Sequence, residues 1–236
     1  MKTNTEYKNA ALAALKGNWA PAVLAAAVFF LLTTLIITPS EMPLLNGTFA
    51  NMSAMAASGD IEGMMAAYSQ ATSWSSLGTL LMIFVFNVLY LGFMFAFLKL
   101  LREGDDRITS NMFHIAFKNY WHKVWGIFLM QLFTFLWSLL LIIPGIIKVF
   151  SYAMTPYILE DRPELSANEA IDHSRAMMKG HKFDLFWLYL SFIGWGLLCI
   201  FTAGIGFLWL GPYIQTSVAA FYEDVKADYE LNGGLI

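Results

Sequence analysis

Four long runs without a single charged residue dominate this sequence. They cover residues 19–40, 63–98, 124–147 and 185–222. A helix needs about 20 apolar residues to cross a bilayer, so each run is long enough for at least one crossing. Charged residues make up only 13% of the chain and hydrophobic residues 58%, whereas a soluble domain carries about 25% charged residues. We therefore predict an all-α, polytopic membrane protein.

The positions of Lys and Arg predict the topology. Segments 1–18, 99–123 and 160–182 hold nearly all of these residues, whereas segment 39–75 holds none. Because cytoplasmic loops are enriched in Lys and Arg, we expect both termini on the cytoplasmic side and 39–75 as an outer loop. Six transmembrane helices in three hairpins satisfy this pattern: about 19–38, about 77–98, two within 124–159 and two within 185–222.

The stretch "SLLLIIPGIIKVFSYAMTPYILED" at 138–161 must contain a reversal of the chain. A continuous helix over 124–159 would be about 54 Å long, and the hydrocarbon core is only about 30 Å thick. Lys123 and Arg162 also belong on the same side. We therefore predict a turn at Pro144-Gly145, followed in the sequence by a short return helix. The similar segment "TAGIG" at 202–206 predicts a second hairpin turn.

Short similarities suggest that the architecture repeats. "ALKGNW" at 14–19, "AFKNYW" at 116–121 and "MMKGHKF" at 177–183 each end an amphipathic stretch and precede an apolar hairpin. We predict three repeat-like units within a single integral-membrane domain that spans 1–236. Their approximate bounds are 1–101, 102–161 and 162–224, followed by a cytoplasmic tail, 225–236.

Each hairpin is expected to follow an amphipathic helix that lies in the membrane interface. In one of these, Ser166 and Glu169 form a capping-box pattern, and Ile171, Met177 and Met178 supply an apolar stripe. Such a helix can be a simple anchor or connector. The alternative is a surface that senses lipids or a partner protein.

Longer motifs identify a family resemblance. "LKGNW" (15–19), "IPGIIK" (143–148), "MTPYILED" (154–161) and "AAFYED" (219–224) closely resemble the bacterial integral-membrane family known as domain of unknown function 975. The resemblance covers nearly the whole chain except 39–75. It implies a bacterial plasma (inner) membrane protein, and it implies no activity and no catalytic residue.

Motifs that carry chemistry are missing from the sequence. It contains no phosphate-binding loop, nucleophile elbow, HExxH motif or dinucleotide fingerprint. We therefore expect no enzyme activity, no catalytic or metal-binding residue and no cofactor. The Lys and Arg residues follow topology and form no basic patch, so no nucleic-acid partner is expected. The expected partners are the lipid bilayer and other membrane proteins.

The candidate functional residues are polar groups inside the expected spans. Lys148 is the single charge well within a span; it either extends to the outer interface or marks a functional site. Asn87 and Gln131 either bond neighbouring helices or line a polar path. Trp19, Trp121, Trp125 and Trp187 are expected as interfacial anchors. These features fit a membrane-organising, regulatory or lipid-interacting protein; the alternative is a small-solute transporter or channel with a path near Lys148, Asn87 and Gln131.

Overall fold

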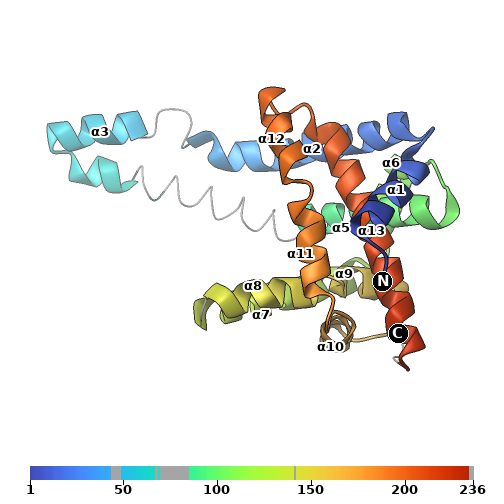
Figure 1. Cartoon of the computed structure of the whole chain (residues 1–236). Coiled ribbons are helices and arrows are strands. Elements are labelled where there is room, and N and C mark those ends of the chain that lie inside the picture. The colour runs from blue at the N-terminus through green and yellow to red at the C-terminus, as the bar shows by residue number, and fades with distance from the viewer. Residues whose placement is uncertain (44–48, 67–68, 70–84, 141, 234–236) are drawn as a thin grey trace. The chain divides into compact units, whose positions relative to one another are not determined.

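The computed structural model describes residues 1–43, 49–66, 69, 85–140 and 142–233. Helices joined by turns and short loops account for all of these residues, which confirms the all-α prediction (Figure 1). The chain divides into two units, each described by itself: residues 1–28 with 88–236, and residues 29–87. The predicted outer loop and the first half of the second predicted span lie partly outside the described residues.

The first unit contains most of the helices. α2 (Trp19–Pro43) and α5 (Asn87–Glu103) each have residues in both units. The helices wholly within the first unit are α1 (Asn4–Leu15), α6 (Ile108–Phe117), α7 (Tyr120–Leu140), α8 (Ile142–Tyr152), α9 (Thr155–Asp161), α10 (Ala167–Met177), α11 (Lys182–Leu190), α12 (Ile193–Phe201) and α13 (Phe207–Leu231).

The second unit contains α3 (Phe49–Ser58) and the parts of α2 and of the segment before α5 that flank it. The rings of Phe29 and Phe86 lie 5.7 Å apart at the two ends of this unit. The hydroxyls of Thr33 and Thr34 both donate to the carbonyl of Phe30, so their polar groups are satisfied within α2.

Six spans are not confirmed by the helices of the structure. Among the described residues, only the run 182–201, which comprises α11, α12 and the turn between them, is long and apolar enough to cross a membrane. A second candidate consists of α1 and residues 19–34, which are bent by 98° at the break between them. The return helix α8 has 11 residues, which corresponds to only about 16 Å of rise. Helices do occupy the described parts of all six predicted positions.

Three turns share the same backbone feature. Gly17, Asn119 and Gly180 have φ angles of 86°, 53° and 97°, in the left-handed region that favours Gly and Asn. Each follows a Lys at the end of α1, α6 or α10, at matching positions of the three sequence similarities. The common geometry explains why Gly or Asn stands there. The predicted repeat as a whole remains a prediction.

The predicted turn at Pro144-Gly145 is wrong. α7 and α8 lie side by side (Figure 1), but α8 begins at Ile142, so Pro144 and Gly145 lie in its first turn and do not form the reversal. Proline is well tolerated there because the first N–H groups of a helix have no intrahelical acceptor. The second predicted turn is confirmed: residues 202–206 separate α12 from α13, and Gly204 has a φ of 85°.

The predicted cap of α10 is confirmed, but its surface role is not. Ser166 and Glu169 form the expected capping box. Ile171, Met177 and Met178 are nevertheless all buried, the two methionines within the main core of the protein. An amphipathic pattern marks an apolar face without identifying what covers it. Here protein covers that stripe, so it is not free to enter a membrane interface.

The core of the first unit is built around α9. Its residues Thr155–Leu159 are all buried. The Tyr157 ring stacks on Tyr222 of α13 at 4.6 Å and meets Phe95 of α5 edge-on at 5.8 Å. Across α5, Gly92 faces the backbone of α6; an added Cβ would lie 2.1 Å from the carbonyl oxygen of Met112. Glycine is therefore required for this close helix contact.

Candidate functional site

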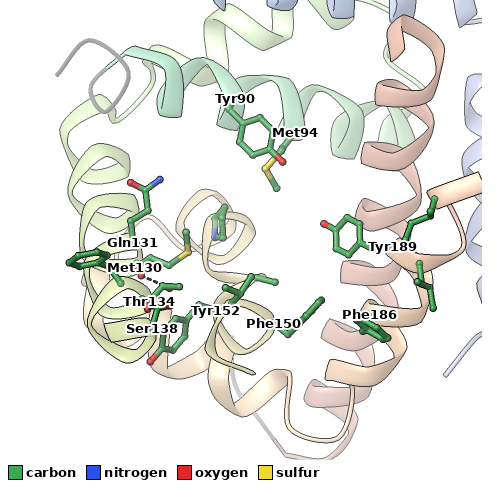
Figure 2. A pocket seen from close by; sticks show the side chains of 16 residues that line it. Tyr90, Met94, Met130, Gln131, Thr134, Ser138, Phe150, Tyr152, Phe186 and Tyr189 are labelled. Carbon is green, nitrogen blue, oxygen red and sulfur yellow. Dashed lines mark hydrogen bonds between the residues drawn. The ribbon is translucent and has the colours of Figure 1, made fainter. Parts of the chain in front are cut away.

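A cavity of about 730 Å³ lies in the first unit between α7, α8 and α11 (Figure 2). Such a volume is typical of small-molecule sites, which range over roughly 300–1,000 Å³. Most of the wall is apolar. This apolar part consists of Met94, Met130, Phe135, Val149, Phe150, Ala153, Pro156, Phe186, Leu190 and Ile193. The cavity can therefore receive a hydrocarbon group.

The polar part of the wall is uncharged. It consists of Tyr90, Gln131, Thr134, Ser138, Tyr152 and Tyr189. Tyr90 and Tyr189 project into the cavity from different helices (Figure 2). The hydroxyl of Thr134 donates to the carbonyl of Met130, and that of Ser138 donates to the carbonyl of Thr134, each at 2.8 Å. Their oxygens can still accept hydrogen bonds.

Two buried hydroxyls, on the residues before and after the lining residue Pro156, have no hydrogen-bond partner in the structure. They belong to Thr155 and Tyr157, which are both fully buried and flank the lining residue Pro156. Unpaired buried hydroxyls are uncommon because each costs about 1–3 kcal/mol.

The three predicted polar-path residues have different places. Gln131 lines the cavity. Lys148 is not among the described lining residues, and its ammonium lies 4.5 Å from the ring centre of Trp137 and 5.6 Å from that of Tyr152. Aromatic faces attract a cation, so the rings of Trp137 and Tyr152 are partners for Lys148. Asn87 is the half-buried first residue of α5 and ends the second unit.

The predicted tryptophan anchors are mostly on the surface. Trp121 is 74% exposed, and Trp125 and Trp187 are also exposed. Trp19 is only half-buried and lines a second, largely apolar cavity of about 500 Å³ with Trp195. Exposed indole rings suit a membrane interface.

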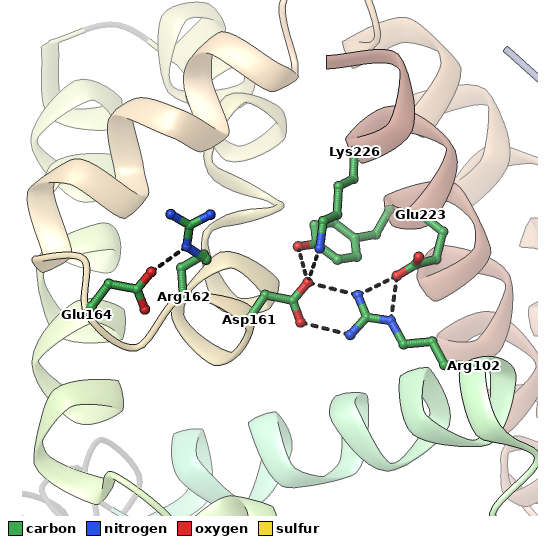
Figure 3. Close-up of polar contacts among 7 residues, drawn as sticks. Arg102, Asp161, Arg162, Glu164, Glu223 and Lys226 are labelled. Carbon is green, nitrogen blue, oxygen red and sulfur yellow. Dashed lines mark hydrogen bonds and ion pairs between the residues drawn. The ribbon is translucent and has the colours of Figure 1, made fainter. Parts of the chain in front are cut away.

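A cluster of ion pairs joins three helices of the first unit (Figure 3). Arg102 at the end of α5 donates two hydrogen bonds of 2.8 Å to Asp161 at the end of α9. It also donates to Glu223 of α13 at 2.7 Å. Lys226 and Tyr222 of α13 donate to the same Asp161 oxygen at 2.7 and 2.9 Å. We call these five residues the Asp161 cluster.

Asp161 is the centre of this network because its side chain is only 9% exposed. Burial alone would raise the pKa of its carboxyl group. The hydrogen bonds and charges of Arg102 and Lys226 outweigh burial and lower that pKa to about 2. The carboxylate is therefore ionised at neutral pH and is fully used in joining α5, α9 and α13.

A neighbouring pair was also hidden in the sequence. Lys123 of α7 is 1% exposed and pairs with Glu160 at 2.7 Å, and it donates a short hydrogen bond to the carbonyl of Ile115. Burial lowers the pKa of Lys123, against the opposing effect of Glu160. The sequence alone indicated only that Lys123 belongs on the cytoplasmic side. The adjacent acids Glu160 and Asp161 at the end of an apolar segment were the available signal.

The cluster borders a cavity of about 360 Å³ that mixes both signs of charge, with Lys99, Arg102 and Lys118 beside Glu103, Glu160 and Asp161. Among the residues the structure describes, no three His, Cys, Asp or Glu side chains are grouped to hold a metal ion. The balanced charges and the internal pairing of Asp161 make this a structural junction between helices.

Fold and site thus define an all-helical protein with an uncharged cavity and an ion-paired helix junction. The chain belongs to the family described as protein of unknown function (DUF975), whose model matches residues 1–151 and 139–229. This confirms the resemblance inferred from its motifs. No curated protein and no solved structure matches the chain.

Proposed function

We propose that this chain is a multi-pass protein of the bacterial plasma membrane that interacts with lipids and has no enzyme activity. The observation that carries the proposal is the surface of α12. None of its nine residues is charged, and only Cys199 is buried. Leu197, Leu198 and Ile200 are exposed, and Phe201 is 88% exposed. Soluble proteins rarely expose a continuous apolar surface of this kind.

The hairpin of α7 and α8 supports the same proposal. Phe135, Leu136 and Leu139 of α7 and Ile143 of α8 are exposed apolar side chains. Lipid tails can cover these side chains and keep them out of contact with water, which is favourable for apolar groups. In the proposed arrangement, the short helices α8, α11 and α12 enter the bilayer as parts of hairpins, and some of them do not cross it completely.

The Asp161 cluster fits the cytoplasmic side of this arrangement. Arg102 and Lys226 belong to segments that the distribution of Lys and Arg assigns to the cytoplasm. Placed there, the ion pairs meet water and headgroups at one edge of the protein and avoid the hydrocarbon core. In this arrangement both termini also lie on the cytoplasmic side.

A transporter is less well supported than a lipid-interacting role. Lys148, the charge expected to line a polar path, contacts Trp137 and Tyr152 and does not belong to the described cavity wall. Gln131 lines a cavity whose described wall is otherwise mainly apolar. That composition suits a lipid chain better than an ion or a charged solute.

Membrane extraction and topology mapping test the proposal. The full-length chain, produced in a bacterium, should stay in the pellet after treatment of membranes at alkaline pH. In a Cys199→Ala background, a thiol introduced by Ala227→Cys should react in inverted vesicles and resist an impermeant reagent in intact spheroplasts. Release into the supernatant at alkaline pH would overturn the membrane proposal, and labelling of intact spheroplasts would overturn the orientation.

A further inference from the structure

We propose that the cavity between α7, α8 and α11 binds an uncharged single-chain lipid whose headgroup carries hydroxyl or ester groups, as in a monoacylglycerol. This inference rests on the proposed membrane location, which would let a lipid enter from the bilayer. It names the ligand class of the cavity described above. Three features of the wall lead to it.

The first feature is the apolar part of the wall. Met94 and Met130 come from α5 and α7, and Phe150 and Phe186 come from α8 and α11. Methionine side chains are unbranched and polarisable, so they adapt to a flexible ligand. The rings of Phe150 and Phe186 meet edge to face with centres 5.9 Å apart, so two adjoining aromatic rings can contact a hydrocarbon chain.

The second feature is the set of neutral polar groups. The Tyr189 hydroxyl can donate or accept a hydrogen bond, and the hydroxyl oxygens of Thr134 and Ser138 can accept one from a ligand hydroxyl. Gln215 donates to the Tyr90 hydroxyl at 3.1 Å, so this ring already has a polar partner and forms a fixed part of the wall.

The third feature is the neutrality of the wall. None of its described residues carries a charge, and the ammonium of Lys148 lies on the rings of Trp137 and Tyr152. A carboxylate or phosphate headgroup would therefore lose its hydration without a counter-charge in the wall. A neutral headgroup loses much less. The wall therefore favours a monoacylglycerol over a fatty acid or a lysophospholipid of the same chain length.

Photolabelling of the whole protein in lipid nanodiscs tests the ligand class. The probe is a monoacylglycerol with a diazirine in its acyl chain, and labelled peptides are located by mass spectrometry. Label should concentrate in peptides that contain Met130, Phe150 and Phe186. Excess monooleoylglycerol should reduce labelling of these peptides about tenfold, because it should compete with the probe for the same site. Oleate and lysophosphatidylglycerol should have little effect.

Two variants with matched controls test the site. Ala153→Phe fills the cavity and should reduce labelling about tenfold, while Ala13→Phe on the exposed face of α1 should not. Tyr189→Phe removes one hydroxyl without changing the packing volume and should weaken competition by monooleoylglycerol roughly fivefold. Tyr229→Phe, far along α13, should leave it unchanged.

Several results would overturn the proposal. Label spread along α12 and insensitive to competitor would show contact with bulk lipid only. Equal competition by oleate or lysophosphatidylglycerol would remove the preference for a neutral headgroup. Unchanged competition in Tyr189→Phe would exclude the hydroxyl contact even if Ala153→Phe failed to fold. A protein that resists alkaline extraction but shows no site-specific label would contradict this inference alone, whereas an extractable protein would contradict the membrane proposal.

Discussion

The guanidinium of Arg102 holds the carboxylate of Asp161 through two parallel hydrogen bonds of 2.8 Å, across 59 residues of sequence. The same carboxylate accepts hydrogen bonds from Tyr222 and Lys226. One nearly buried acid thus ties the ends of α5 and α9 to α13. The stability of this junction can be tested at both partners.

Replacing Arg102 by Met should destabilise the protein. Among the described residues, the change leaves Asp161 with Lys226 as its one remaining cationic partner. Removing one member of a mostly buried pair costs about 2–4 kcal/mol once its partial exposure is considered. Thermal unfolding in detergent, followed by circular dichroism, measures the change. Arg162→Met is the matched control: Arg162 pairs with exposed Glu164, and such surface pairs contribute about 0–1 kcal/mol. Equal effects of the two variants would contradict the assigned role of Arg102.

The lowered pKa of Asp161 predicts how stability depends on pH. The pKa falls from 3.8 to about 2 on folding, so the unfolded chain takes up a proton at higher pH than the folded one. The contribution of this group is therefore complete above about pH 5 and is lost as pH falls through 4 towards 2. Asp161→Asn should be less stable than the wild type at pH 7, with the difference shrinking over that acidic window. A difference that stays constant from pH 6 to pH 2.5 would contradict the shift.

Gly92→Ala should weaken the contact between α5 and α6. Its Cβ would lie 2.1 Å from the Met112 carbonyl oxygen, and relieving such a clash by moving a helix costs about 1–3 kcal/mol. Gly194→Ala in α12 is the control because nothing lies within 4 Å of its added Cβ. The control should be neutral or gain up to about 1 kcal/mol of helix propensity. Unfolding in sodium dodecyl sulfate titrations compares the two, and equal loss would exclude the proposed contact.

Local features of the fold were predictable from the sequence. The capping box of Ser166 and Glu169 depends on residues three apart, so the sequence pattern alone specifies it. The turn at 202–206 follows from two glycines that interrupt an apolar run. The prediction of a turn at Pro144 is wrong because proline is acceptable both in a turn and in the first turn of a helix.

Long-range features were not predictable. Arg102 and Lys123 carry the same charge as every other Lys and Arg on their side of the predicted membrane, and only the fold pairs them with Asp161 and Glu160. Lys148 was expected either to extend to the outer interface or to mark a functional site, whereas the fold brings its ammonium to the ring of Trp137 on a neighbouring helix. The uncharged cavity likewise depends on how α7, α8 and α11 meet, which hydrophobic periodicity does not specify.

The central claim is that the exposed apolar face of α12 lies in lipid, and spin labelling tests it most directly. Phe201→Cys in a Cys199→Ala background places a nitroxide at an 88% exposed position, and Ala227→Cys provides an exposed position in α13 for comparison. In liposomes, power saturation should show the label at residue 201 relaxed by oxygen and protected from a water-soluble nickel chelate, with the reverse at residue 227. Stronger relaxation by the nickel chelate at residue 201 would contradict the account.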